Sequence, residues 1–328
     1  MEALPRVSLW PHWPFTPPLQ TMTQRRHLLR LPTDSKSSAI RLLAFLPQVV
    51  IAVASAGMLV ACRPAAAATP SPDASAVAGA DAPPAAPTSA PLGLSGSVGL
   101  GALTMPTYEG SDRHRTLAVP LLALNWRTAD WGTVSLDTQG LAWQVVDRDG
   151  WRASVIGAID PGRKDRRPSG FDIAPGDKRL AGMGRIGAGV DVGAAFGYGP
   201  VQLSMLKALG DGGSRGARVT LGAELPWAVT TKLGVSAAVV GTWADRKYMQ
   251  SYFGVTAAQS AASGYDAYTP RAGLQKVELD VGADQALTEH LHLKAGVGLS
   301  RLESDAARSP LVQRRTGLTA QVGVAYAF

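Results

Sequence analysis

The chain has 328 residues, a formal net charge of +7 and a single cysteine. Residues 1–68 hold seven Lys and Arg against two Asp and Glu, a net charge of +5, so +7 minus +5 leaves only +2 for residues 69–328. A nearly neutral main segment argues against a nucleic-acid-binding protein. One cysteine also excludes a disulfide within the chain and a cysteine-based metal site.

Residues 1–68 have the order of a secretory signal. Four arginines between positions 25 and 41 precede the uncharged apolar run 42–61, and alanines follow. An Ala-x-Ala cleavage site at 66–68 competes with a lipoprotein-like box that would make Cys62 an acylation site. We favour the first, because the strands described next supply their own lipid-facing surface. An uncleaved helix is the third alternative, since the run is long enough to span a bilayer.

The next segment is a linker. Residues 63–92 contain 12 Ala and 7 Pro among 30 positions, a composition that cannot bury a core. We therefore divide the chain into a targeting segment (1–68), a disordered Ala/Pro-rich linker (69–92) and a main domain (93–328).

The main domain alternates with a period of two. In 276–283, 290–300 and 317–328, apolar residues occupy every second position, and the positions between them are mostly glycine, charged or polar. Stretches this long suit strands that cross a bilayer at a tilt, which takes about 9–11 residues. A soluble β-sandwich also alternates, but its strands are shorter, and a polar face rich in glycine and in charges of both signs is typical of a barrel lumen. The sequence predicts an all-β transmembrane antiparallel β-barrel.

We expect about twelve strands, with ten as the alternative because the third and fourth are short. They lie near 93–105, 115–127, 132–138, 140–147, 150–160, 183–197, 199–208, 214–225, 231–243, 273–286, 289–301 and 315–328. The connections alternate in length, as in outer-membrane barrels with short periplasmic turns and long outer loops. The longest gaps, 161–182, 244–272 and 302–314, all fall on the predicted outer side.

The last strand also resembles the targeting signal that the outer-membrane barrel assembly machinery reads. That signal places a polar residue, a glycine and two aromatic residues at fixed spacing, the second aromatic residue being the last of the chain. Gln321, Gly323, Tyr326 and Phe328 fill it in order.

Two loop segments resemble a known family. Residues 106–112, which continue into 118–122, and residues 243–256 are similar to signature segments of the MipA/OmpV family of Gram-negative outer-membrane proteins. The resemblance covers about residues 93–328. It implies an outer-membrane barrel that interacts with the bilayer and the assembly machinery. The MipA branch is described as a scaffold that joins a lytic transglycosylase to a penicillin-binding protein in peptidoglycan assembly, and other branches are linked to porin-like permeation, adhesion and stress response.

No catalytic constellation stands out. The main domain has three histidines, and none has a serine two residues on, as outer-membrane lipid hydrolases do. His290 and His292 are more simply lumen or rim residues than metal ligands. We expect no enzyme and no cofactor.

Two groups of residues are candidates for function. A loop site at the barrel mouth is expected from Tyr108, Glu109, Asp112, Tyr248, Gln250, Tyr252 and Phe253, because loop 244–272 is the most aromatic part of the main domain and we expect it to fold inward. A lumen lining is expected from Arg152, Arg185, Asp191, Arg218, Glu224, Lys276, Glu278, Asp280 and Lys294. These charges either pair across strands or select solutes in a pore. The leading hypothesis is the murein scaffold, and the alternatives are a porin-like channel for small solutes and a surface adhesin.

Overall fold

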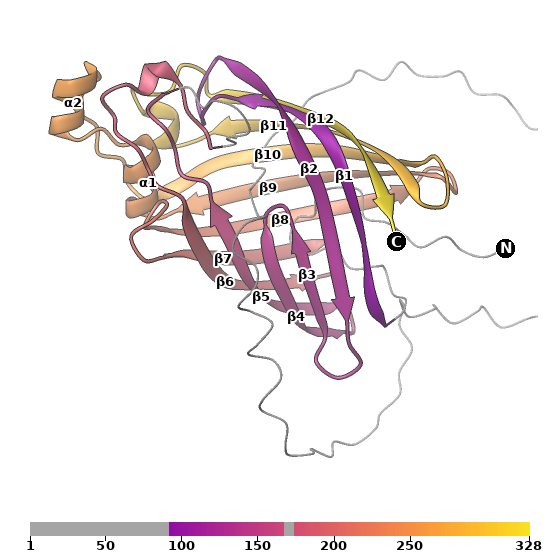
Figure 1. Ribbon diagram of the computed structural model, residues 1–328. Helices are drawn as coiled ribbons and strands as arrows, with labels where there is room; N and C mark the ends of the chain where they lie inside the picture. Colours follow the sequence, from indigo (N-terminus) through magenta and orange to yellow (C-terminus); the bar gives the residue numbers. More distant parts are fainter. Residues whose placement is uncertain (1–91, 167–173) are drawn as a thin grey trace, which may run out of the picture.

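The computed structural model describes residues 92–166 and 174–328, which form one closed antiparallel β-barrel (Figure 1). The expectations for the signal, the linker and Cys62 fall outside these residues. The strands are β1 (Gly93–Pro106), β2 (His114–Arg127), β3 (Thr133–Asp137), β4 (Gly140–Arg148), β5 (Trp151–Asp160), β6 (Gly189–Tyr198), β7 (Val201–Leu209), β8 (Ala217–Ala228), β9 (Leu233–Ala244), β10 (Gly273–Ala286), β11 (Leu291–Leu302) and β12 (Thr316–Ala327). The helices are η1 (Lys178–Leu180), α1 (Arg246–Phe253), α2 (Ala257–Ser263) and η2 (Ala306–Arg308). The prediction of an all-β barrel with twelve strands is confirmed.

Pairing of the first and last strands closes the barrel. Each strand pairs with its neighbours in the chain, and β1 pairs with β12 from Ser97 opposite Ala327 to Thr104 opposite Ala320. Beyond the ladder, the Phe328 backbone N–H donates to the Gly96 carbonyl at 2.9 Å, and the Phe328 carbonyl accepts from the Gly96 N–H at 3.0 Å. A bilayer offers no water to an open sheet edge, so this closure is what makes β structure tolerable there.

One strand starts later than the alternation predicts. The sixth strand was expected over 183–197 but begins at Gly189. Gly182 and Gly184 have φ angles of +83° and +73°, which belong to turns and not to strands. Met183 between them is buried among the loops. The expectation that this segment is strand was therefore wrong, and Arg185 lies in a loop.

The outer surface is apolar and the inward positions are buried. On β12, Val322, Val324 and Tyr326 are 52%, 41% and 50% exposed, while the alternate Gly323 and Ala325 are buried. Strands β9, β10 and β11 also alternate buried inward positions with more exposed outward ones. An apolar outer surface is unfavourable in water but matches a lipid-facing belt. None of the described helices is long and apolar enough to cross a membrane.

The two ends of the barrel differ. Short turns and both ends of the described barrel lie at one end, and the long loops with α1 and α2 lie at the other (Figure 1). Aromatic side chains gather near the short turns, where Trp126 meets Trp131 at 5.2 Å between ring centroids and Trp151 meets Tyr198 at 4.7 Å. Amphipathic rings favour the membrane–water interface. By the usual orientation of such barrels, this end faces the periplasm and the long loops face outward.

The β3–β4 hairpin is much shorter than its neighbours. Asp137 ends β3 because its Oδ1 accepts from the backbone N–H groups of Gln139 at 2.7 Å and Gly140 at 3.1 Å, which locks a tight turn. Only Ala123–Arg127 of the long strand β2 pairs with β3. The upper part of β2, residues 114–122, therefore has no strand beside it on that side among the described residues.

The β1–β12 seam requires a glycine. A Cβ on Gly99 would lie 2.1 Å from the Val324 carbonyl oxygen and 2.6 Å from the Ala325 Cα, both backbone atoms. We expect Gly99→Ala to strain the seam by about 1–3 kcal/mol, lowering the unfolding midpoint by roughly 2–10 °C. The unfolding midpoint is measured from the temperature at which the mobility of the folded barrel on a gel changes to that of the unfolded chain. Gly157→Ala, where the new Cβ has no atom within 4 Å, is the control, and equal midpoints would contradict the argument.

Candidate functional site

The long loops pack into a single assembly over the outer mouth, which we call the cap. It comprises loops 107–113, 161–166, 174–188, 210–216, 245–272 and 303–315. Its side chains form two buried clusters. The first joins Tyr248, Met249, Phe253 and Ala306 to Ala244 and Leu302 at the ends of β9 and β11, and the second contains Tyr108, Leu180, Met183, Val255 and Leu311. The cap therefore has a buried core of its own, which continues onto the upper ends of two strands.

Helix α1 anchors the first cluster. Asp245 is its N-cap, with Oδ1 accepting from the Tyr248 backbone N–H at 2.8 Å. Tyr248, Met249 and Phe253 are its buried residues, at 6%, 0% and 1% exposure. Gly216 of a neighbouring loop has no room for a side chain against Tyr248, so the helix lies directly on that loop. Helix α1 therefore packs against a neighbouring loop, and inward folding of loop 244–272 stays a prediction.

Helix α2 lies at the edge of the cap. Thr256 and Gln259 form a capping box, and Gly264 ends the helix with φ of +79°. The helix has no buried residue, and Figure 1 shows it standing off the barrel end. The Gln259 side-chain amide donates to the Met183 carbonyl at 2.7 Å, and Gly182 packs against the backbone of Ala262 and Ser263.

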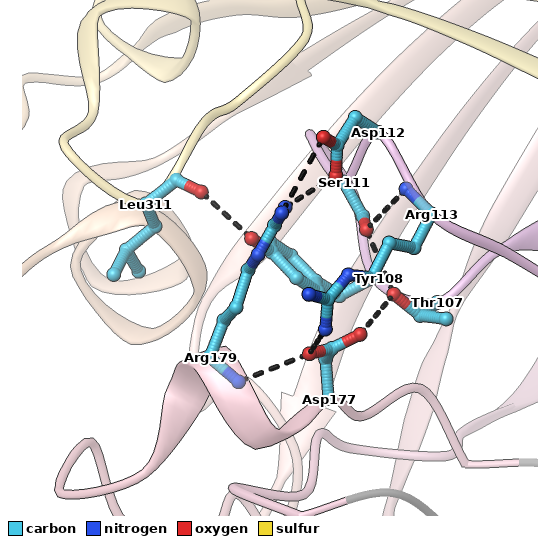
Figure 2. Close-up of polar contacts among 8 residues, drawn as sticks. All are labelled: Thr107, Tyr108, Ser111, Asp112, Arg113, Asp177, Arg179 and Leu311. Atoms are coloured by element: carbon cyan, nitrogen blue, oxygen red, sulfur yellow. Dashed lines mark hydrogen bonds and ion pairs between the residues drawn. The ribbon is translucent and has the colours of Figure 1, made fainter.

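Asp177 joins two loops that are far apart in sequence (Figure 2). Its carboxylate accepts from the Thr107 hydroxyl at 3.1 Å and from the Arg179 backbone N–H at 3.0 Å, and it pairs with Arg113 at 3.2 Å. A backbone bond from Gly176 to the Thr107 carbonyl, 2.7 Å long, runs beside it. Asp177 itself is buried. These contacts hold loop 107–113 against residues 174–180.

Tyr108 and Asp112 belong to the same junction (Figure 2). The Tyr108 hydroxyl donates to the Leu311 carbonyl at 3.0 Å, and burial raises the pKa of Tyr108 to about 12. Asp112 forms an ion pair with Arg179, and the hydrogen bond from that guanidinium lowers the pKa of the Asp112 carboxyl. Tyr108 thus meets loop 244–272 through Val255, whereas Asp112 faces the opposite loop.

Asp160 forms a second junction at the top of β5. Its two oxygens accept from the Tyr252 hydroxyl and from the Ser214 backbone N–H at 3.0 Å. Arg163 donates to the Tyr252 carbonyl at 2.5 Å and is only 3% exposed. Burial raises the pKa of Tyr252 far above its ordinary value and lowers that of Arg163. Loops 161–166, 210–216 and 245–272 therefore meet at one carboxylate.

Glu109 ties the cap to the lumen wall. Its carboxylate lies 3.0 Å from the Lys276 ammonium and accepts from the Gln275 amide at 2.8 Å. Lys276 also pairs with Glu278 at 3.0 Å. Two of the expected sites, mouth and lumen, are thus joined through this lysine.

The other expected lumen charges have different surroundings. Arg218 binds Asp191 at 2.6 Å and lies 5.1 Å from the centroid of the Tyr248 ring. Glu224 hydrogen bonds to Ser236, and Asp280 lies among Glu278, Lys276 and Glu224. Arg152 donates to the Gly199 carbonyl at the periplasmic end, at 2.8 Å. Arg185 is exposed and outside the strands, so its expected place in the lumen lining is wrong.

Asp284 was not among the lumen residues expected from the sequence. This buried carboxylate accepts from Lys294 at 2.7 Å and lies 2.6 Å from the His292 ring nitrogen. It shares the inward parity of Lys276, Glu278 and Asp280, and Lys294 is directly opposite in the register. Parity was a usable signal, but the pairing register was not available from the alternation. The described residues hold no group of three His, Cys, Asp or Glu side chains suited to a metal ion.

The remaining expected residues are Gln250 and those of the assembly signal. Gln250 lies in α1, and its carbonyl accepts from Gly254 at 3.1 Å. Gln321, Gly323 and Tyr326 lie on β12, and Phe328 follows its end. Tyr326 points outward and stacks on His290 with ring centroids 5.3 Å apart.

A closed barrel with an apolar outer belt and loops capping one mouth defines the class: this is an outer-membrane β-barrel of the Gram-negative type. The family model described as MltA-interacting protein MipA matches residues 98–328. The chain belongs to the MipA family.

Solved structures of outer-membrane proteins match the chain at low similarity. An outer membrane channel of Pseudomonas putida F1 is 15% identical over 76% of this chain and 100% of its own, with a TM-score of 0.38. OprD of Pseudomonas aeruginosa is 12% identical over 71% and 65%, with a TM-score of 0.31. The translocator domain of the autotransporter NalP of Neisseria meningitidis is 12% identical over 74% and 90%, with a TM-score of 0.39. No curated protein matches the chain.

Removing the Asp177 carboxylate should loosen the cap. Asp177→Ala deletes three contacts to a buried charged acceptor, each worth about 1.5–3 kcal/mol in stability. We expect trypsin to cleave loop 174–188 of the folded barrel at least ten times faster than in the unaltered protein. Asp130→Ala, in an exposed periplasmic turn, is the control. Cleavage at the unaltered rate would show that Asp177 does not hold the cap.

The raised pKa of Tyr108 makes the cap sensitive to strong base. The folded protein favours the neutral phenol, so the stabilisation from this group is complete below about pH 10 and is lost as the pH rises through about 12. Titrating tyrosinate absorbance in the unaltered protein and in Tyr108→Phe should give a difference curve with its midpoint near pH 12. A midpoint near pH 10 would mean that the ring is in water.

Proposed function

We propose that this protein is a non-enzymatic outer-membrane scaffold that joins a lytic transglycosylase to a penicillin-binding protein during peptidoglycan assembly. The observation that carries the proposal is the family match over residues 98–328, because the family's description names MltA as the interacting protein. Both partners would be bound from the periplasmic end.

The cap supports a scaffold over a permanently open pore. Met249, Phe253 and Leu311 are at most 1% exposed, and the Asp177 and Asp160 junctions link loops from across the mouth. A scaffold needs no passage for solutes. A cap with a buried core does not interfere with scaffolding, whereas a general porin needs an open water path.

The periplasmic rim supplies a surface for partners. Trp131 is 47% exposed in the turn after β2, and the Trp143 indole donates to its carbonyl at 2.8 Å, which fixes this turn. Tryptophan is enriched at the centres of protein interfaces as well as at membrane interfaces. The β2–β3 turn projects beyond its neighbours in Figure 1, so it is the first place where a periplasmic partner would touch.

A porin-like channel is the second candidate. The paired charges Glu109, Lys276 and Glu278 at the mouth, and Asp284 with Lys294 further down, form a polar track along β10 and β11. Such a track suits small polar solutes if the cap opens. A surface adhesin is the third, and the exposed helix α2 is the feature that favours it.

Two measurements on the same purified protein separate these functions. We expect no steady conductance in planar bilayers from the unaltered barrel, and binding of a soluble lytic transglycosylase at micromolar affinity or tighter. Deleting residues 248–268 should open a current and leave that binding intact, because the partner is bound at the other end. Steady current from the unaltered protein, without transglycosylase binding, would favour the channel instead.

A further inference from the structure

Exposed arginines gather where β10, β11 and β12 reach the outer end of the barrel. One lies in the last turn of β11, two directly precede β12, one lies just before β10, and one belongs to η2. They are Arg301, Arg314, Arg315, Arg271 and Arg308. The side chains of Arg271, Arg301 and Arg308 are 75%, 66% and 58% exposed, and the other two are exposed as well. We call these five residues the arginine rim.

The contacts of the backbone and of one carboxylate hold the arginine rim in a single sector. Pairing of β11 with β12 places Arg301 opposite Thr316, and the next residue, Leu302, donates its N–H to the Arg315 carbonyl at 2.8 Å. Arg271 and Arg308 meet at Asp305, which lies 3.2 Å from the Arg271 Nε and forms an ion pair with Arg308. Segments around positions 271, 301, 308 and 315 therefore lie together.

Positive charge exceeds negative charge in the arginine rim. Glu303 pairs with Arg301 at 3.2 Å, and Asp305 is shared by two arginines. Arg314 and Arg315 form no ion pair with any residue in 92–166 or 174–328. Five arginines minus two carboxylates leave a charge of +3. Exposed ion pairs contribute little to stability, so these guanidinium groups can turn to an external anion at small cost.

The arginine rim lies at the outer edge of the lipid-facing belt. Leu291, at the start of β11, is paired with Tyr326, whose ring stacks on His290 at the periplasmic end. Arg301 lies ten residues further along β11 and continues the outward parity of Leu299. Ten residues at about 3.3 Å each, tilted by about 40°, rise about 25 Å, the height of an apolar band. Arg301 is therefore level with the headgroups of the outer leaflet.

The chemistry of the arginine rim suits phosphate. A guanidinium group is planar and binds a phosphate through two parallel hydrogen bonds, whereas a lysine offers a single charged point. All five cations of the rim are arginines. In a Gram-negative outer membrane the outer leaflet consists of lipopolysaccharide, and its lipid A base carries phosphates directly above the acyl chains. Clusters of basic residues beside a membrane recognise anionic headgroups of this kind.

The backbone beneath the arginine rim is fixed by the cap. The N–H groups of Gln313 and Arg314 donate to the Gly110 carbonyl at 2.8 and 3.0 Å. Ala306 and Leu311 of the same loop are buried in the two cap clusters, at 0% and 1% exposure. The guanidinium groups therefore project from a backbone that is already ordered, which lowers the entropy lost on binding.

We propose that the arginine rim binds the phosphate groups of lipid A in the outer leaflet. Arg301, Arg314 and Arg315 contact the phosphates, and Arg271 and Arg308 add positive charge beside them. The acyl chains of the same molecule lie against the outward apolar residues below, including Val277, which is opposite Arg301 in the register. This site is independent of the periplasmic binding that the scaffold requires.

The test is a titration of the purified full-length mature protein in a non-ionic detergent with diphosphorylated lipid A, followed by native mass spectrometry. EDTA is present, so that divalent cations do not bridge the phosphates to carboxylates. The same lipid without its phosphates is titrated in parallel. We expect saturable binding of the diphosphorylated form and at least tenfold weaker binding of the dephosphorylated form, since each basic residue near anionic lipid contributes about 1 kcal/mol, or about fivefold.

Two variants address the arginine rim. Arg314→Gln/Arg315→Gln should weaken binding of diphosphorylated lipid A at least tenfold, and Arg301→Gln about fivefold, with little change for the dephosphorylated lipid. Arg148→Gln/Lys232→Gln is the matched control, because it removes two exposed positive charges at the periplasmic end. It should bind as the unaltered protein does. Heat-modifiable gel mobility shows that each variant is folded.

Four results would overturn the proposal. Equal affinity for the two forms of lipid A would show that only the acyl chains are bound. Unchanged affinity in both folded rim variants would place the phosphates elsewhere. Displacement by an equal concentration of phosphatidylglycerol would mean that any anionic lipid suffices. Displacement by an equal concentration of inorganic phosphate would indicate a site for the free anion and not for a lipid.

Discussion

Closure of the hydrogen-bonded ladder between β1 and β12 is the constraint on which the rest of the structure depends. In a bilayer every backbone polar group must find a partner, and a twelve-stranded sheet does so only when its first and last strands meet. Gly99 lets the seam close, and the backbone of Phe328 extends it to Gly96. Once the sheet is closed, its outward positions face lipid and its inward positions must be filled, paired or wet.

Inward-facing side chains find their partners in different ways in the cap and in the lumen. At the outer mouth, aromatic and aliphatic side chains around Met249 and Tyr108 form cores like those of a soluble domain, and Asp177 and Asp160 collect donors from separate loops. Along the lumen, charges of opposite sign pair across strands on one wall, and apolar residues pack on the other. The cap covers the outer mouth, so a scaffold would bind its partners at the opposite end, on the periplasmic rim.

Alternation in the sequence was sufficient to predict the barrel, its twelve strands and the side that carries the long loops. Alternate residues of each strand face the lipid and the lumen, so this pattern can be read within each strand alone. It was wrong at the start of β6, where residues 183–188 continue the alternation but two turn glycines place them in the cap. It was silent on Asp177, which meets Thr107 from 70 positions away. Contacts between loops leave no periodic signal.

The central claim is that the outer mouth is closed by a cap with a core of its own. Amide hydrogen exchange of α1, measured by mass spectrometry on the protein in native outer membranes, tests it most directly. Buried packing of Tyr248, Met249 and Phe253 predicts protection of residues 246–253 that approaches that of strands β9 and β10 and far exceeds that of α2. Exchange of α1 within seconds, as fast as α2, would contradict the account.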